Sequence, residues 1–215
     1  WIANQLKINY DELNRISVNV NKYPNASLLL VTKNRPQSII KLLIDKGYSL
    51  FGENRVQEAD EKFSDLEGHN IKLHLIGPLQ TNKVKLALTL FDTIQSIDRP
   101  KLVKEISKHI NSDSNLKTRD FFIQVNIGEE PQKAGVSLNE TKDLYDYAIS
   151  ENLKISGLMC IPPFDEKPDK FFKKMSYLRD NIDKSLTLSM GMSNDYEIAL
   201  SLKSDMVRIG SKIFK

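Results

Sequence analysis

A lysine stands where an apolar segment of the chain ends. Residues 26–32 (ASLLLVT) form a short, continuous apolar run, and Lys33 follows it directly. Such a run is typical of a strand that is buried on both faces, as in a parallel sheet. A lysine just past the carboxyl end of that strand would face the mouth of the sheet, partly desolvated, where a neutral amine is a nucleophile able to form a Schiff base. The alternative is a solvated loop lysine, one of many in this chain.

Two loops near the carboxyl end of the chain are rich in small residues. One contains Gly191 and Ser193, and the other contains Gly210 and Ser211. Glycine lets the backbone approach an anion closely, serine hydroxyls donate hydrogen bonds, and the helical stretch after each loop favours negative charge at its N-terminus. The two loops therefore indicate a phosphate site. Ser193 is also interpretable as a helix cap, which is compatible with phosphate binding.

Arg208 precedes Gly210 by two residues, so a phosphate held at Gly210 would place this arginine near the ring of the same ligand. Proteins that use pyridoxal 5′-phosphate (PLP) place either a carboxylate or an arginine at the pyridine nitrogen. An arginine keeps that nitrogen unprotonated and weakens the ring as an electron sink. The competing interpretation of Arg208 is an ordinary surface ion pair.

Composition and the remaining motifs exclude several classes of function. No Cys and His cluster has metal-ligand spacing, and no glycine-rich nucleotide loop or nucleophile elbow is present. The 31 Lys and Arg residues exceed the 28 Asp and Glu residues by only three, too few to indicate nucleic acid or a membrane surface. A lone cysteine, Cys160, cannot form an intrachain disulfide and favours a cytoplasmic location. No apolar run approaches the roughly 18 residues that a membrane span needs.

Alternating strands and helices would position these residues. Hydrophobic patterning predicts strands at 26–32, 48–51, 71–76, 93–96, 120–126, 153–159, 187–189 and 206–209. It predicts helices at 3–18, 36–47, 55–66, 82–90, 100–110, 139–150, 168–182 and 195–202. This alternation of strands and helices is typical of an α/β fold. It predicts one domain over residues 1–215, a (β/α)8 barrel of the TIM type with an extra N-terminal helix. An open, doubly wound sheet is the alternative.

Seven stretches of the chain resemble, in order, the pyridoxal phosphate homeostasis protein family, which is related to the barrel domain of alanine racemase. They are residues 29–33 (LLVTK), 51–58 (FGENRVQE), 74–83 (HLIGPLQTNK), 124–127 (QVNI), 157–159 (GLM), 188–193 (LSMGMS) and 206–214 (MVRIGSKIF). The chain departs from the usual family pattern at Thr32, Asn34 and Ser211, where the family has Ser, Thr and Thr. Each replacement keeps a hydroxyl or an amide.

The resemblance implies a set of site residues. Lys33 would carry PLP as a Schiff base, and Arg208 would face the pyridine nitrogen of the cofactor. Asn54 would lie beside the cofactor and His74 near it, although a histidine inside a strand is more often a hydrogen-bonded core residue. The residues implied to hold the phosphate are Ser193, Gly210 and Ser211.

The resemblance also implies a carrier rather than a turnover enzyme. Racemases with this barrel add a second domain and dimerise, which supplies a second base, whereas one barrel uses all 215 residues of this chain. We therefore expect a cytoplasmic monomer that takes part in vitamin B6 and amino-acid homeostasis, with PLP-requiring enzymes as its clients. Two alternatives stay open: a PLP-dependent amino-acid racemase or lyase of low activity, and a cofactor-free isomerase or aldolase that acts on sugar phosphates.

Overall fold

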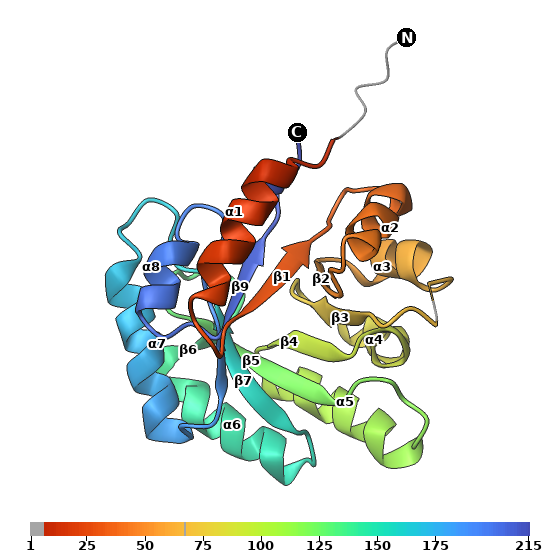
Figure 1. Ribbon diagram of the computed structural model, residues 1–215. Coiled ribbons are helices and arrows are strands. Elements are labelled where there is room, and N and C mark those ends of the chain that lie inside the picture. Colours follow the sequence, from red (N-terminus) through yellow and green to blue (C-terminus); the bar gives the residue numbers. More distant parts are fainter. Residues whose placement is uncertain (1–6, 67) are drawn as a thin grey trace.

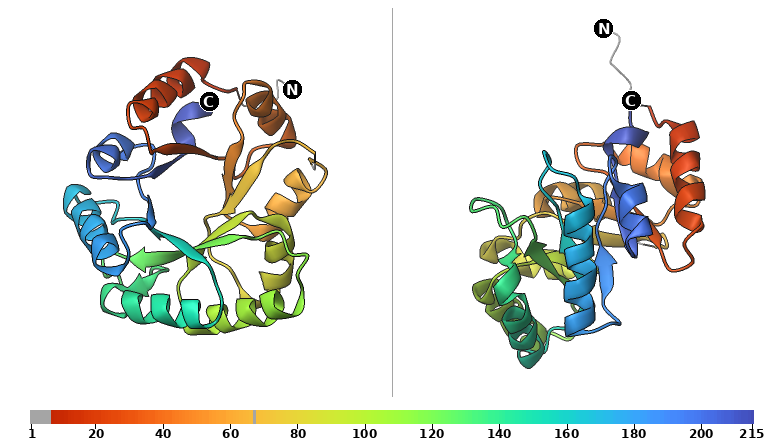
Figure 2. Two further views of the ribbon diagram at one scale, coloured as in Figure 1. Left: turned by 60° about the horizontal axis from the view of Figure 1, so that its bottom comes forward. Right: turned by 90° about the vertical axis from the view of Figure 1, so that its left-hand side faces the viewer.

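Parallel strands close into a barrel in this protein (Figures 1 and 2). The structure, a computed structural model, describes residues 7–66 and 68–215. The barrel strands are β1 (Ser27–Val31), β2 (Leu50–Glu53), β3 (Lys72–Leu75), β4 (Thr93–Ile97), β5 (Asp120–Asn126), β7 (Ile155–Cys160), β8 (Thr187–Ser189) and β9 (Met206–Ile209). They follow the order β4-β3-β2-β1-β9-β8-β7-β5, and pairing of β4 with β5 closes the ring. A short strand, β6 (Val136–Ser137), pairs with β5 beside this ring.

Helices form a ring outside the barrel, as the left view of Figure 2 shows. They are α1 (Tyr10–Asn21), α2 (Gln37–Asp45), α3 (Val56–Phe63), α4 (Val84–Leu90), α5 (Pro100–Ser112), α6 (Thr141–Ser150), α7 (Asp169–Ile182) and α8 (Tyr196–Ser201). Three short 3₁₀ turns are η1 (Thr81–Lys83), η2 (Leu138–Glu140) and η3 (Ser211–Ile213). The predicted barrel is therefore confirmed, and three of its strands, β5, β8 and β9, have the predicted bounds.

The boundaries of the second strand and of the leading helix differ from the prediction. The second strand was expected at 48–51, but the amide of Tyr48 donates to the carbonyl of Leu43 at the end of α2, and pairing with β3 begins only at Leu50. Helix α1 begins at Tyr10 because the side chain of Asn9 accepts the amide of Glu12 and caps the first turn. The part of the predicted helix 3–18 that falls in residues 1–6 lies outside the described residues.

Two separate apolar layers stabilise the barrel. A small cluster fills its interior and contains Leu29, Ile76, Phe122 and Met206. A much larger cluster packs between the outer face of the strands and the helices. Because successive side chains of a strand point to opposite faces, Leu29 and Val31 both face the interior of the barrel, and Lys33 follows two residues beyond the end of β1.

The two ends of the described chain meet beside the loop after β1. Ile8 and Phe214 form an antiparallel bridge, flanked by a hydrogen bond from the amide of Lys215 to the carbonyl of Lys7. The guanidinium of Arg35, in the β1–α2 loop, lies 4.7 Å from the centre of the Phe214 ring. The C-terminal residues thus support the loop that carries Lys33. No helix among residues 7–66 and 68–215 has the length and apolar composition to cross a membrane.

Candidate functional site

The rim at the carboxyl ends of the barrel strands gathers most of the predicted site residues. Because the barrel strands are parallel, their carboxyl ends meet at one rim. The residues placed in loops that follow these ends are Lys33 after β1, Asn54 after β2, Ser193 after β8, and Gly210 and Ser211 after β9. The rim therefore brings together an amine, an amide, two hydroxyls and a glycine from four strands.

The side chain of Lys33 is exposed to solvent. The expectation that it would be partly desolvated is wrong for this arrangement, because Lys33 lies two residues beyond the end of β1, past the cover of the barrel wall. Within the described residues it forms no ion pair, so its amine is not committed to a carboxylate. Lys33 is thus accessible to a ligand at the rim.

A buried ion-pair cluster lies beside the Lys33 loop. We call it the Lys62 cluster, and it consists of Glu53 from β2 with Glu58 and Lys62 from α3. The ammonium of Lys62 lies 2.6 Å from Glu53 Oε1 and 3.0 Å from Glu58 Oε1. Its nitrogen also donates to the carbonyl of Thr32 at 2.7 Å, and the Thr32 hydroxyl donates to Glu53 Oε1 at 2.6 Å.

Burial acts differently on the two carboxylates of the Lys62 cluster. Loss of solvent raises the pKa of Glu53, and its hydrogen bonds from Lys62 and Thr32 only partly oppose that change. Partial burial also acts to raise the pKa of Glu58, but the hydrogen bonds from Lys62 and from the Asn34 amide outweigh it and lower the pKa. Lys62 was not among the predicted site residues; the spacing of Glu58 and Lys62, one helical turn apart, is the signal that could have indicated their pairing.

Arg208 begins a chain of hydrogen bonds through the barrel interior. Its Nη1 donates to Ser189 Oγ at 2.8 Å, and its Nη2 donates to the carbonyl of Cys160 at 2.8 Å. Ser189 Oγ in turn donates to Gln95 Oε1 at 2.7 Å, and Gln95 Nε2 lies 2.8 Å from His74 Nδ1. Arg208 is buried, so the interpretation as a surface ion pair is excluded, and burial lowers its pKa.

The direction of these hydrogen bonds determines the protonation state of His74. The amide nitrogen of Gln95 can only donate, so His74 Nδ1 accepts and the ring is neutral with its proton on Nε2. Burial lowers the pKa of His74 to about 4, consistent with a neutral ring. Gln95 and Ser189, which join Arg208 to His74, were not predicted as site residues, because isolated polar residues in strands form no distinctive pattern.

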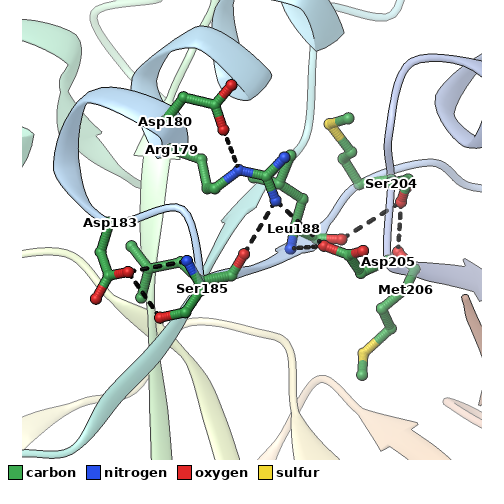
Figure 3. A network of polar contacts seen from close by, with 10 residues as sticks. Arg179, Asp180, Asp183, Ser185, Leu188, Ser204, Asp205 and Met206 are labelled. Atoms are coloured by element: carbon green, nitrogen blue, oxygen red, sulfur yellow. Dashed lines mark hydrogen bonds and ion pairs between the residues drawn. The ribbon is translucent and has the colours of Figure 1, made fainter. Parts of the chain in front are cut away.

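His74 also lines a cavity at the opposite end of the barrel. This cavity, of about 680 Å³, is lined by residues at the amino ends of the strands, among them Ser27, Lys72 and Thr187. Figure 3 shows part of its wall, where Arg179 donates to Asp180 at 2.7 Å and lies 3.4 Å from Asp205. His74 is joined to Arg208 only through Gln95 and Ser189, and its place near a ligand at the rim stays a prediction.

The two glycine-containing loops are fixed by contacts with neighbouring strands. Gly191 has φ of +102°, and an added Cβ would lie 2.6 Å from the Cβ of Ala199, so only glycine fits this turn. The carbonyl of Gly191 accepts the amide of Arg208 at 2.9 Å, which joins the loop after β8 to β9. At Gly210 an added Cβ would lie 3.1 Å from Val31, so this loop packs closely against β1.

The serine hydroxyls of the two loops are not used as helix caps. Asp195 occupies the cap position of α8, and its carboxylate accepts the amide of Met192 at 2.7 Å. Ser193 is buried, and its hydroxyl makes no hydrogen bond to another described residue. Ser211 is exposed at the first position of η3. Both hydroxyls are therefore available to a ligand at the rim.

Comparison with known proteins identifies close relatives. The family model described as alanine racemase, N-terminal domain, matches residues 4–215. A pyridoxal phosphate homeostasis protein of Aquifex aeolicus is 38% identical over 198 residues, which cover 88% of this chain and 86% of that protein. One from Escherichia coli is 35% identical over 229 residues, covering 99% and 95%. The structure of PipY from Synechococcus elongatus with PLP bound has a TM-score of 0.83 at 27% identity and covers 95% of this chain and 99% of that chain.

The low pKa of His74 predicts a specific loss of stability in acid. The unfolded chain takes up a proton on this histidine below a pH of about 6.5, whereas the folded protein does so only near 4. The contribution of neutral His74 to the free energy of unfolding is therefore complete above about pH 6.5. It is lost as the pH falls toward 4, and about 2 kcal/mol is lost by pH 5. Chemical unfolding at pH 7 and pH 5 measures it. A His74→Asn variant keeps an acceptor for Gln95, and between pH 7 and pH 5 its free energy of unfolding should fall by about 2 kcal/mol less than that of the wild type. Equal losses in the two proteins would show that His74 is not the group responsible.

Proposed function

The chain belongs to the alanine racemase N-terminal domain family, together with the pyridoxal phosphate homeostasis proteins, and from this membership we propose that it binds PLP on Lys33. The proposed role is to carry PLP in vitamin B6 and amino-acid homeostasis rather than to turn over a substrate. Its relative PipY has been solved with PLP bound, which supports the choice of ligand. We further propose that residues 1–215 form one PLP-binding domain, active as a cytoplasmic monomer that supplies PLP-requiring enzymes.

The groups at the rim fit the groups of PLP. When bound, PLP supplies an aldehyde that joins an amine in a reversible covalent bond, a Schiff base. Lys33 offers an exposed amine, and the free hydroxyl of Ser193 with Ser211 and the close-packed Gly210 offers a cradle for the phosphate. Asn54 is half-buried after β2, and we assign it a place beside the ring. Membership in this family, with Lys33 on the same rim as these two loops, carries the proposal.

Arg208 supports a carrier over a catalyst. A guanidinium has five N–H groups, and the hydrogen bonds of Arg208 to Ser189 and Cys160 use only two of them. We propose that a remaining N–H group meets the pyridine nitrogen. A cation at that position keeps the nitrogen unprotonated, so the ring withdraws electrons poorly and carbanion chemistry is disfavoured. Since Ser189 and Cys160 hold the guanidinium in place, it cannot easily turn away from the ring.

A slow amino-acid racemase is the second candidate, because the matching family model describes a domain of alanine racemase. We expect the protein, loaded with PLP, to show little exchange of the α-proton of L-alanine in D₂O, followed by NMR. The physical reason is the poor electron sink that Arg208 imposes. An alanine racemase under the same conditions serves as the positive control. Rapid exchange or racemisation would sink the carrier proposal and favour the enzyme.

Replacing Lys33 tests the covalent link. We expect Lys33→Ala to abolish the absorbance near about 420 nm that a Schiff base of PLP gives, because the substitution removes the amine on which we propose that the Schiff base forms. The unfolding free energy should change by less than about 1 kcal/mol, since an exposed side chain is removed. Lys142→Ala, at an exposed lysine of α6, is the control and should keep the absorbance. Borohydride reduction followed by peptide mapping identifies the labelled lysine, and a label elsewhere would refute the assignment.

A substitution at Gly210 tests the phosphate cradle. Gly210→Val should weaken binding of PLP at least about tenfold more than binding of pyridoxal, which has no phosphate, because the side chain would push the loop out of place against Val31. Titration of each ligand into both proteins measures the two affinities. Equal losses for PLP and pyridoxal would show that this loop does not hold the phosphate.

A further inference from the structure

The Lys62 cluster holds both peptide groups that flank Lys33. The carbonyl of Thr32, which accepts from Lys62 Nζ at 2.7 Å, belongs to the peptide bond before Lys33. The amide of Asn34, which donates to Glu58 Oε1, belongs to the peptide bond after it. Peptide groups are planar, so anchoring the two of them sets the backbone dihedrals of Lys33 and the direction of its Cα–Cβ bond.

The loop after β1 needs such an anchor because of its conformation. Asn34 has φ of +60°, in the left-handed region that residues other than glycine rarely adopt. The amide of Arg35 turns back to the carbonyl of Thr32 at 3.0 Å, so this carbonyl accepts from both Arg35 and Lys62. The turn is therefore closed by one hydrogen bond of its own, and Lys62 and Glu58 of α3 add two more.

Stability alone does not account for the Lys62 cluster. Glu53 and Lys62 are buried, and removing charges from water costs about as much free energy as their pairing returns. Oε2 of Glu53 is buried without a hydrogen-bond partner among the described residues, which adds to that cost. An apolar contact between β2 and α3 would stabilise the fold at least as well. What the cluster provides, and an apolar contact cannot, is a donor for Thr32 and an acceptor for Asn34 on the two sides of Lys33.

We propose that Glu58 and Lys62 are positioning residues for Lys33, which orient its amine and so set the rate at which the covalent bond to PLP forms and breaks. The inference rests on the proposed function. In the forward step the Lys33 nitrogen attacks the aldehyde carbon and loses two protons, a C=N bond replaces the C=O bond, and the aldehyde oxygen leaves as water. A misdirected amine would slow this step while leaving the ring and phosphate contacts of the ligand intact.

Variants at Glu58 separate positioning from folding. Glu58→Ala removes the acceptor of the Asn34 amide, whereas Glu58→Gln keeps an acceptor oxygen without the charge. The matched control is Asp146→Ala, which breaks an exposed ion pair of the same one-turn spacing with Lys142 on α6. Rapid mixing with PLP gives the rate of bond formation from absorbance near about 420 nm. Affinity for pyridoxamine 5′-phosphate, which has no aldehyde, reports the contacts that do not involve Lys33.

We expect Glu58→Ala to slow bond formation at least about tenfold and to leave the affinity for pyridoxamine 5′-phosphate within about twofold. Glu58→Gln should recover most of the lost rate, and Asp146→Ala should react like the wild type. If Glu58→Ala does not fold, Glu58→Asp withdraws the carboxylate from Asn34 while keeping its charge, and the same slowing is expected. An unchanged rate, or equal losses for both ligands, would overturn the positioning role. Absence of the absorbance in the wild type would overturn the proposed function itself.

Discussion

The pairing of β4 with β5 is the contact on which the rest of the protein depends. It joins Thr93 to Asp120 and Ile94 to Phe121, and it converts a run of neighbouring parallel strands into a closed ring. Closure leaves no free sheet edge in the ring and brings strands far apart in the chain face to face across the interior. Without it, the loops after β1 and β9 would still be neighbours, but the interior between them and β4 would be open to water.

The closed interior of the barrel holds a series of hydrogen-bonded polar side chains away from water. Arg208, Ser189, Gln95 and His74 come from four strands, and three hydrogen bonds link them in series. A buried guanidinium is costly unless its hydrogen bonds are made, so the order of these contacts keeps Arg208 in one position. The same order keeps His74 neutral. This series of hydrogen bonds therefore links the rim, where we place PLP, to the cavity at the opposite end of the barrel.

The two ends of the barrel use charge in different ways. At the amino ends of the strands, Arg179 is paired with Asp180 and Asp205, and Asp205 also accepts the amide of Leu188 (Figure 3). These contacts connect α7, β8 and the approach to β9, so they serve the fold. At the rim, Lys33 is left without an ion pair to any residue that the structure describes, while the charges of the Lys62 cluster hold its backbone. The rim thus combines an exposed lysine with buried charges that hold its backbone.

Sequence patterns by themselves determined the alternation of strands and helices and the position of most rim residues, whereas the pairing of β4 with β5 decided between a closed barrel and an open sheet. Apolar runs mark buried parallel strands, and a residue that follows such a run must lie at the rim, so Lys33, Asn54 and Gly210 could be placed without coordinates. What the tertiary structure decided is which side chains meet. Lys62 reaches the Thr32 carbonyl, 30 residues away, and Gln95 reaches Ser189, 94 residues away, because strand register and ring closure bring them together. Such contacts cannot be predicted from local sequence patterns, since each depends on the path of the whole intervening polypeptide.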